Sequence, residues 1–263
     1  MSRTIAITTQ KGGVAKTTTT ANLAAAWGGA GKKVLVVDMD PQFGLTGALG
    51  VDPGGDDVPG TAVDLFQGDA LEGVVMPEIL PGVDLVAGHR NLRSVELTLA
   101  DKLGRETFLR EALREAKRYD LVLIDCPPTL NLLTVNALMA AKEAVVPVSM
   151  QDRGAYQGAL EVAGLLPDLK RIGGKVKIKA VVKVKANPSR VMYGSISDAL
   201  EAEVEAGHFP VAETEIPDRA DFNNAMGWGR PLVVWRPQSP GARAYVELAR
   251  ELDGSRVQLK AAA

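Results

Sequence analysis

Short apolar runs alternate with longer amphipathic or alanine-rich stretches along most of the chain. The apolar runs predict strands just after Arg3 and at residues 33–38, 119–125, 143–148, 176–184 and 209–214. The longer stretches predict helices at residues 19–30, 130–141, 154–166, 192–206 and 240–252, with two more around Gly104 between residues 92 and 117. Strands that alternate with helices of about 10–15 residues indicate a mostly parallel sheet with helices on both faces. We therefore expect a doubly wound α/β fold and a single domain over residues 1–263.

Composition narrows the class of protein without identifying a partner. The 263 residues are 46% apolar and 24% charged, which is ordinary for a globular protein. No apolar run reaches the ~18 residues of a membrane span, and the strand pattern begins at once, so we expect neither a membrane span nor a signal peptide. The single cysteine, Cys126, excludes an internal disulfide and suits a reducing cytoplasm, and two histidines make a structural zinc site improbable. With a net charge of −2, nucleic-acid binding would need a local basic patch.

A glycine-containing loop follows the first strand and leads into a helix. Its sequence is Lys11-Gly12-Gly13-Val14-Ala15-Lys16-Thr17-Thr18. In such a layout the free backbone N–H groups of the turn and of the first helical turn can cradle phosphate oxygens. Lys16 would contact the β- and γ-phosphates, and the Thr17 hydroxyl would bind Mg²⁺. The loop departs from the pattern G-x-x-x-x-G-K-[ST], because Gln10 and Ala15 stand where glycines belong.

Two aspartate motifs follow later strands. Asp38-Met39-Asp40-Pro41-Gln42 ends the second strand, and Asp125 ends an apolar run of four residues, 121–124. An aspartate after such a run is typical of a Walker B strand, where it holds Mg²⁺ directly or through water. Ligands of parallel α/β sheets bind beyond the carboxyl ends of the strands, and all three motifs fall at such ends. The structural alternative is that Asp40 and Asp125 only cap the helices that follow.

Together the three motifs resemble the deviant Walker motifs of the ParA/MinD/Soj ATPases, a branch of the P-loop NTPases. The segments Ile216-Pro217 and 241–249 are similar to the ParA branch, so the resemblance covers nearly the whole chain. It implies an ATPase that binds ATP and Mg²⁺ and closes into a homodimer around them. By this resemblance Lys11 reaches the partner's phosphates, Asp40 orients the attacking water and Pro217 lies near the adenine. A lysine supplied in trans would neutralise charge as an arginine finger does; the alternative is a solvated loop lysine.

Three related classes fit the sequence less well. MinD-type proteins end in an amphipathic membrane helix, whereas the segment after Asp253 has little apolar surface, so we expect no membrane binding and a flexible tail over residues 254–263. Nitrogenase-type iron proteins need two cluster-binding cysteines per subunit, which Cys126 alone cannot supply. Some ParA proteins carry a helix-turn-helix before the loop, whereas only nine residues precede Gln10, so operator-specific repression is not expected.

The remaining class is the short ParA type, which implies non-specific DNA binding by the ATP dimer in the cytoplasm, on the nucleoid, and a ParB-like activator. Eight basic residues and no acidic residue occur between positions 169 and 190. Lys175, Lys177 and Lys179 alternate, so they are predicted to share one strand face, as DNA contacts or as protection of an edge strand. Arg190 resembles the family's DNA-contacting arginine by alignment of the glycine at 194.

Two departures and two alternative functions stay open. Asp218 and Asp221 stand where the family carries a basic run, which weakens the expected DNA surface. Ala15 is tolerable at negative φ and costly at positive φ. One alternative function is a ParA-like ATPase that positions a cargo other than DNA. The other is an ATP-dependent ligase of the dethiobiotin-synthetase type, which shares the fold and would have its own small-molecule pocket.

Overall fold

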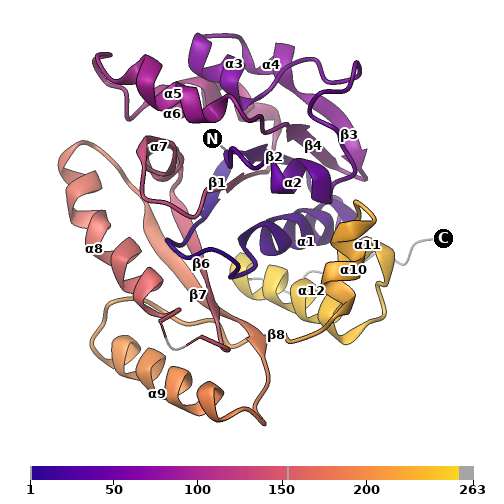
Figure 1. Ribbon diagram of the computed structural model, residues 1–263, viewed down its shortest axis with the longest axis vertical. Coiled ribbons are helices and arrows are strands. Elements are labelled where there is room, and N and C mark those ends of the chain that lie inside the picture. The colour runs from indigo at the N-terminus through magenta and orange to yellow at the C-terminus, as the bar shows by residue number, and fades with distance from the viewer. Residues whose placement is uncertain (1, 153, 255–263) are drawn as a thin grey trace.

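A single mixed sheet forms the centre of the molecule. Residues 2–152 and 154–254 are described by a computed structural model, and within them eight strands pair in the order β3-β4-β2-β5-β1-β6-β7-β8 (Figure 1). All neighbouring strands are parallel except β3 and β4. The strands are β1 (Arg3–Ile7), β2 (Val34–Asp38), β3 (Met76–Leu80), β4 (Val83–Val86), β5 (Leu121–Asp125), β6 (Glu143–Ser149), β7 (Lys177–Ala186) and β8 (Ile216–Pro217).

Helices cover both faces of this sheet (Figure 1). One face carries α1 (Lys16–Gly29), α2 (Gly44–Ala48), α10 (Asp221–Gly227), α11 (Leu232–Trp235) and α12 (Pro240–Asp253). The other carries α3 (Ala62–Gln67), α4 (Leu71–Val74), α5 (Leu92–Leu99), α6 (Phe108–Ala112), the 3-10 helix η1 (Leu113–Arg118), α7 (Leu132–Ala140), α8 (Gln157–Arg171) and α9 (Val191–Glu205). The predicted doubly wound, mostly parallel α/β fold is confirmed. None of the helices in the described ranges has the length and apolarity that a bilayer crossing requires.

β1 illustrates how the strands divide their side chains. Ile5 and Ile7 pack into the cluster beneath α1 and α12, whereas Ala6 packs into the cluster on the opposite face. Because both faces are covered, β2 and β5 bury every side chain. The central strands therefore read as continuous apolar runs, which made them easy to locate from sequence. Cys126 is buried in the second cluster, where burial raises the pKa of its thiol to about 12, in keeping with a packing role.

Two predicted elements differ from the structure. The strand predicted at residues 209–214 is wrong, since only an isolated bridge between Val181 and Val211 forms there. The N–H groups of Glu213 and Thr214 instead donate to the Glu251 carboxylate at 2.7 and 2.9 Å, so pairing with β7 resumes only at Ile216. The first helix begins at Lys16, three residues before the predicted start at Thr19, and this places Lys16 in its first turn.

Candidate functional site

The three predicted motifs meet at the carboxyl edge of the sheet. β5 lies between β1 and β2, and the register places Asp125 opposite both Ile7 and Asp38. Parallel neighbours end at the same edge, so the loop after β1 and the aspartates that end β2 and β5 share one site. This edge is the crevice in which doubly wound proteins bind ligands.

Lys16 lies buried at the centre of the phosphate loop. Its side chain is 7% exposed, and its Nζ donates to the Lys11 carbonyl at 2.9 Å and to the Thr9 carbonyl at 3.3 Å. Desolvation by burial lowers the pKa of this amine. The backbone N–H groups of residues 16–18 have no acceptor among the described residues, as expected for the first turn of a helix. A buried cation held only by carbonyls beside free N–H groups suits a phosphate group.

Ala15 has a left-handed backbone, with φ 61° and ψ 29°. Alanine is unfavourable in this conformation, as expected for a positive φ, because the left-handed region costs a residue with a Cβ roughly 1–2 kcal/mol. The loop therefore keeps the shape that glycine favours while carrying a methyl group. Backbone strain of this kind concentrates at ligand sites, where the surrounding structure holds it in place.

Asp125 joins the loop helix to the Walker B strand. Its two carboxylate oxygens accept hydrogen bonds from the Thr17 hydroxyl at 2.8 Å and the Thr20 hydroxyl at 2.9 Å. Burial and the neighbouring Asp38 carboxylate raise the pKa of Asp125 to about 8. Within the described ranges no cluster of three His, Cys, Asp or Glu residues forms a metal cage. Mg²⁺ binds through one or two protein oxygens together with water and phosphate, and the Thr17 hydroxyl and the Asp125 carboxylate can supply such oxygens.

Asp38 is a site residue to which the sequence assigned no role of its own. It is fully buried and accepts hydrogen bonds from the Thr46 N–H at 2.9 Å, the Thr46 hydroxyl at 2.8 Å and the Asp40 N–H at 3.1 Å. Burial raises its pKa to about 6. A Cβ on Gly88 would come within 2.7 Å of this carboxyl, so glycine is needed there. Asp38 thus fixes the loop that carries Asp40.

The helix-capping alternative for Asp40 and Asp125 does not hold. The N-cap of α2 is Phe43, without a side-chain cap, and that of α7 is Asn131, whose side chain accepts the Thr134 N–H. Asp40 instead accepts the backbone N–H of Gln42 at 2.9 Å, a local turn that leaves it half-buried at the rim of the site.

Two lysines connect the phosphate loop to distant parts of the chain. Lys11 forms an ion pair with Asp152, which follows β6, and its side chain is 34% exposed. Lys185 at the end of β7 donates from Nζ to the Gly13 carbonyl at 2.8 Å and has a left-handed backbone, φ 53°. Neither contact could be predicted from the sequence, because the partners are far apart along the chain.

The predicted DNA contacts fall into two separate places. Arg190 follows the carboxyl end of β7 and pairs with Asp218 at 3.5 Å, so the acidic departure of this chain neutralises this arginine. Lys177 and Lys179 are exposed at the amino end of the same ten-residue strand, about 30 Å away along the strand. Lys175 precedes β7, so it does not share the strand face predicted for it. Pro217 ends β8, paired with Ala186 at the edge that carries the site.

Comparison with known proteins identifies the family to which this chain belongs. A family model described as an AAA domain matches residues 2–179. The chromosome-partitioning ATPase Soj of Thermus thermophilus is 40% identical over 255 residues, covering 95% of each chain. The sporulation initiation inhibitor protein Soj of Bacillus subtilis is 33% identical, covering 96% of this chain and 98% of its own length. The structure of cobyrinic acid a,c-diamide synthase from Mycobacterium smegmatis, with a bound ATP analogue and magnesium, is 30% identical over 100% of both chains, with a TM-score of 0.80. This chain belongs to the ParA/MinD family of P-loop ATPases.

Proposed function

We propose that this chain is a partition ATPase, a single domain over residues 1–263 that works in the cytoplasm on the nucleoid. It closes into a homodimer around ATP and Mg²⁺, holds DNA non-specifically, and is released when a ParB-like partner stimulates hydrolysis. The buried Lys16 amine carries the proposal, because its hydrogen-bond partners among the described residues are backbone carbonyls and it belongs to the first turn of a helix. The Thermus thermophilus relative is a chromosome-partitioning ATPase, which supports the proposed cellular process.

The loop residues divide the work of holding the nucleotide. Residues 12–18 would surround the phosphates with backbone N–H groups, and Lys16 would exchange its carbonyl partners for phosphate oxygens. Thr17 would bind Mg²⁺, which neutralises phosphate charge when bound. Asp125 would hold the ion through water or through the Thr17 hydroxyl, since both its oxygens already accept hydroxyl protons. Pro217 would lie beside the adenine.

Lys11 and Asp40 would act in hydrolysis. Lys11 would leave Asp152 and reach the phosphates bound by the partner, where a positive charge stabilises the spread negative charge of the transition state. Asp40 would hold the attacking water, at a position that Asp38 fixes through the loop backbone. Replacement of Asp40 by alanine should therefore keep ATP binding and trap an ATP dimer, which light scattering would detect; a variant that stays monomeric with ATP removes this role.

DNA binding would depend first on Arg190, with Lys175, Lys177 and Lys179 at the opposite edge as a separate set of charges. The arginine is 54% exposed and its ion pair with Asp218 is long, at 3.5 Å, so a DNA phosphate can replace Asp218. If several phosphates are neutralised, the logarithm of the binding constant should fall with the logarithm of salt at about −0.9 per phosphate.

A gel shift of a non-specific duplex with ATP, ADP and no nucleotide tests the proposal. We expect retardation with ATP only, its loss in Arg190→Ala, and a stronger shift in Asp218→Asn, which frees the arginine. The matched control is Arg171→Ala, which removes an exposed arginine that pairs with Asp168 on α8. Retardation that ignores the nucleotide, or that survives Arg190→Ala at moderate salt, would refute the DNA site.

The likeness to the diamide synthase keeps an ATP-dependent ligase as the second candidate. A ligase would hydrolyse ATP only with a small-molecule acid and would not respond to DNA. The same gel shift, followed by ATPase assays with and without duplex, separates the two. A DNA-binding ATPase that a ParB-like protein does not stimulate would favour the third candidate, a positioning ATPase for another cargo.

A further inference from the structure

A pocket lies at the amino edge of the sheet, opposite the phosphate loop. It opens beside Thr4 at the start of β1, Lys142 just before β6, and Lys175 just before β7. Its volume is about 530 Å³, within the range of about 300–1,000 Å³ that small-molecule sites occupy. Since β1 separates the two edges by its full length of five residues, the pocket is distinct from the nucleotide site.

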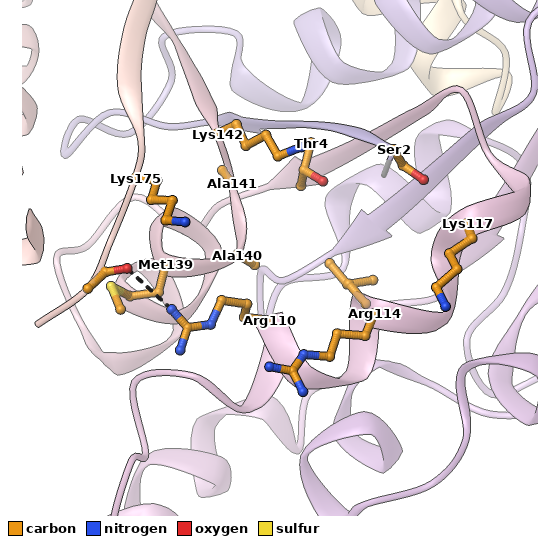
Figure 2. A pocket seen from close by; sticks show the side chains of 12 residues that line it. Ser2, Thr4, Arg110, Arg114, Lys117, Met139, Ala140, Ala141, Lys142 and Lys175 are labelled. Atoms are coloured by element: carbon orange, nitrogen blue, oxygen red, sulfur yellow. Dashed lines mark hydrogen bonds between the residues drawn. The ribbon is translucent and has the colours of Figure 1, made fainter.

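The walls of this pocket are strongly basic. Arg110 comes from α6, and Arg114 and Lys117 come from η1. Lys142 and Lys175 come from the loops that precede β6 and β7. We call the pocket that these five residues line the basic pocket. Figure 2 shows these five side chains spread around Ala140 and Ala141. Among the residues that the structure describes, no carboxylate lines the pocket.

Few of these charges are neutralised by the chain itself. Arg114 pairs with Glu111 at 2.8 Å, and Arg110 reaches the same carboxylate at 3.7 Å and the Gly173 carbonyl at 3.4 Å. In the part of the chain that the structure describes, Lys117, Lys142 and Lys175 have no ion pair. Cations at this edge also face the C-terminal ends of η1, α7 and α8, each equivalent to about half a negative charge. The partial negative charges of three helix ends and the charge of Glu111 together are smaller than the positive charge of the five cations. Helix dipoles therefore do not balance the charge of the pocket.

The floor of the basic pocket is apolar. Ala140 and Leu113 are half-buried and supply its accessible surface, while Met139 and Ala141, which also line it, are each 2% exposed. A bare ion would leave this surface in contact with water, whereas a ligand with an organic body covers it. Arginine forks and lysine amines around one hollow match oxygens that carry more than one negative charge, as phosphate groups do at neutral pH.

We propose that the basic pocket binds a small organic phosphate, with at least two negative charges and a body of about the size of a nucleoside. The anion relieves the mutual repulsion of Lys117, Lys142 and Lys175, and its body rests on Leu113 and Ala140. Binding there stabilises the folded chain independently of the nucleotide at the opposite edge.

The test uses adenosine 3′,5′-bisphosphate as the probe, with the phosphate loop saturated by Mg²⁺ and ADP. We expect one probe per chain by calorimetry, and at 100 times the dissociation constant a rise in melting temperature of about 5–10 °C. Lys142→Gln with Lys175→Gln should weaken binding by about tenfold or more, because each lost charged hydrogen bond costs about that factor. Both lysines are exposed, so the double variant should fold, and its ligand-free melting point should equal or exceed that of the unaltered chain.

The matched control is Lys170→Gln with Lys179→Gln, which removes two exposed lysines outside the pocket and should leave probe affinity within about twofold. Equal affinity in the pocket variant and the unaltered chain would overturn the proposal, as would loss of probe binding when ADP is present. Inorganic pyrophosphate that binds as tightly as the probe would show that the apolar floor is unused and would overturn the organic ligand. A DNA duplex that displaces the probe from the ADP-bound chain, where the proposed function expects no DNA binding, would replace the small ligand with nucleic acid.

Discussion

Ala15 tests whether the phosphate loop of this chain stores backbone strain. Its left-handed backbone (φ 61°) costs a residue with a Cβ roughly 1–2 kcal/mol, and glycine avoids that cost. Glycine loses about 1 kcal/mol through the greater freedom of the unfolded chain. The methyl group of Ala15 is half-buried against the core cluster under α1, and its removal costs about 0.4 kcal/mol, half the value of one buried methylene. Ala15→Gly should therefore leave stability nearly unchanged or raise it slightly.

Ala202→Gly is the matched control, because Ala202 is exposed inside the regular helix α9. There the same substitution relieves no strain and should lower the free energy of unfolding by about 1 kcal/mol. Urea unfolding of the nucleotide-free protein measures both variants, and the expected difference between them is about 1 kcal/mol. In a chain of this length that difference corresponds to roughly 2–4 °C in melting temperature. Equal losses at the two positions would refute the strain.

Three further predictions follow from the site. Lys16→Ala removes a buried amine with no carboxylate contact, so the nucleotide-free melting point should hold or rise, while the shift that ATP induces should vanish in a thermal-shift assay. Asp152→Asn releases Lys11 from an exposed ion pair that contributes about 0.2–1 kcal/mol. Light scattering should therefore detect ATP-dependent dimers at a roughly one- to fivefold lower protein concentration. The control Asp168→Asn, which breaks an exposed ion pair on α8, should not change that concentration. Burial raises the pKa of Asp38 to about 6 and that of Asp125 to about 8, so the folded chain holds protons that the unfolded chain releases near pH 4, and stability without nucleotide should fall as pH rises from about 4 to about 8. Urea unfolding across that range checks the slope, which Asp125→Asn should flatten; an unchanged slope in that variant contradicts the assignment.

The fold and the catalytic edge were predictable because both are encoded locally. Buried parallel strands read as apolar runs, and a polar residue directly after such a run must lie at the carboxyl edge. Lys16, Asp40 and Asp125 could thus be brought together from their places in the sequence alone. The strand predicted at residues 209–214 failed because the Glu251 carboxylate accepts the N–H groups of Glu213 and Thr214, a contact with α12 that the apolar pattern does not encode.

Contacts between distant segments could not be predicted. Lys11 meets Asp152 only because β6 lies next to β1, and Arg190 meets Asp218 only because β8 pairs with β7. The basic pocket is a further case, since it combines side chains from α6, η1 and two loops. The alternation around Lys175 predicted a strand position, whereas the strand starts two residues later. Nothing in the local pattern shows where β7 begins, because Lys and Val occur both in strands and in the loops that precede them.

At the carboxyl edge, each cation that the proposed function assigns to a phosphate already has an oxygen partner in the same chain. Lys16 has two carbonyls, Lys11 has Asp152, and Arg190 has Asp218. ATP and DNA binding would then be exchanges of partners, and the measured affinity is the difference between two sets of contacts. The two exposed ion pairs cost only about 0.2–1 kcal/mol each to break. Lys16 differs because its burial already disfavours the charged amine. The exchange of neutral carbonyls for a phosphate therefore stabilises Lys16 more than it stabilises the two exposed cations. Nucleotide affinity should therefore depend far more on Lys16 than on Lys11, whose loss should first affect dimer formation and hydrolysis.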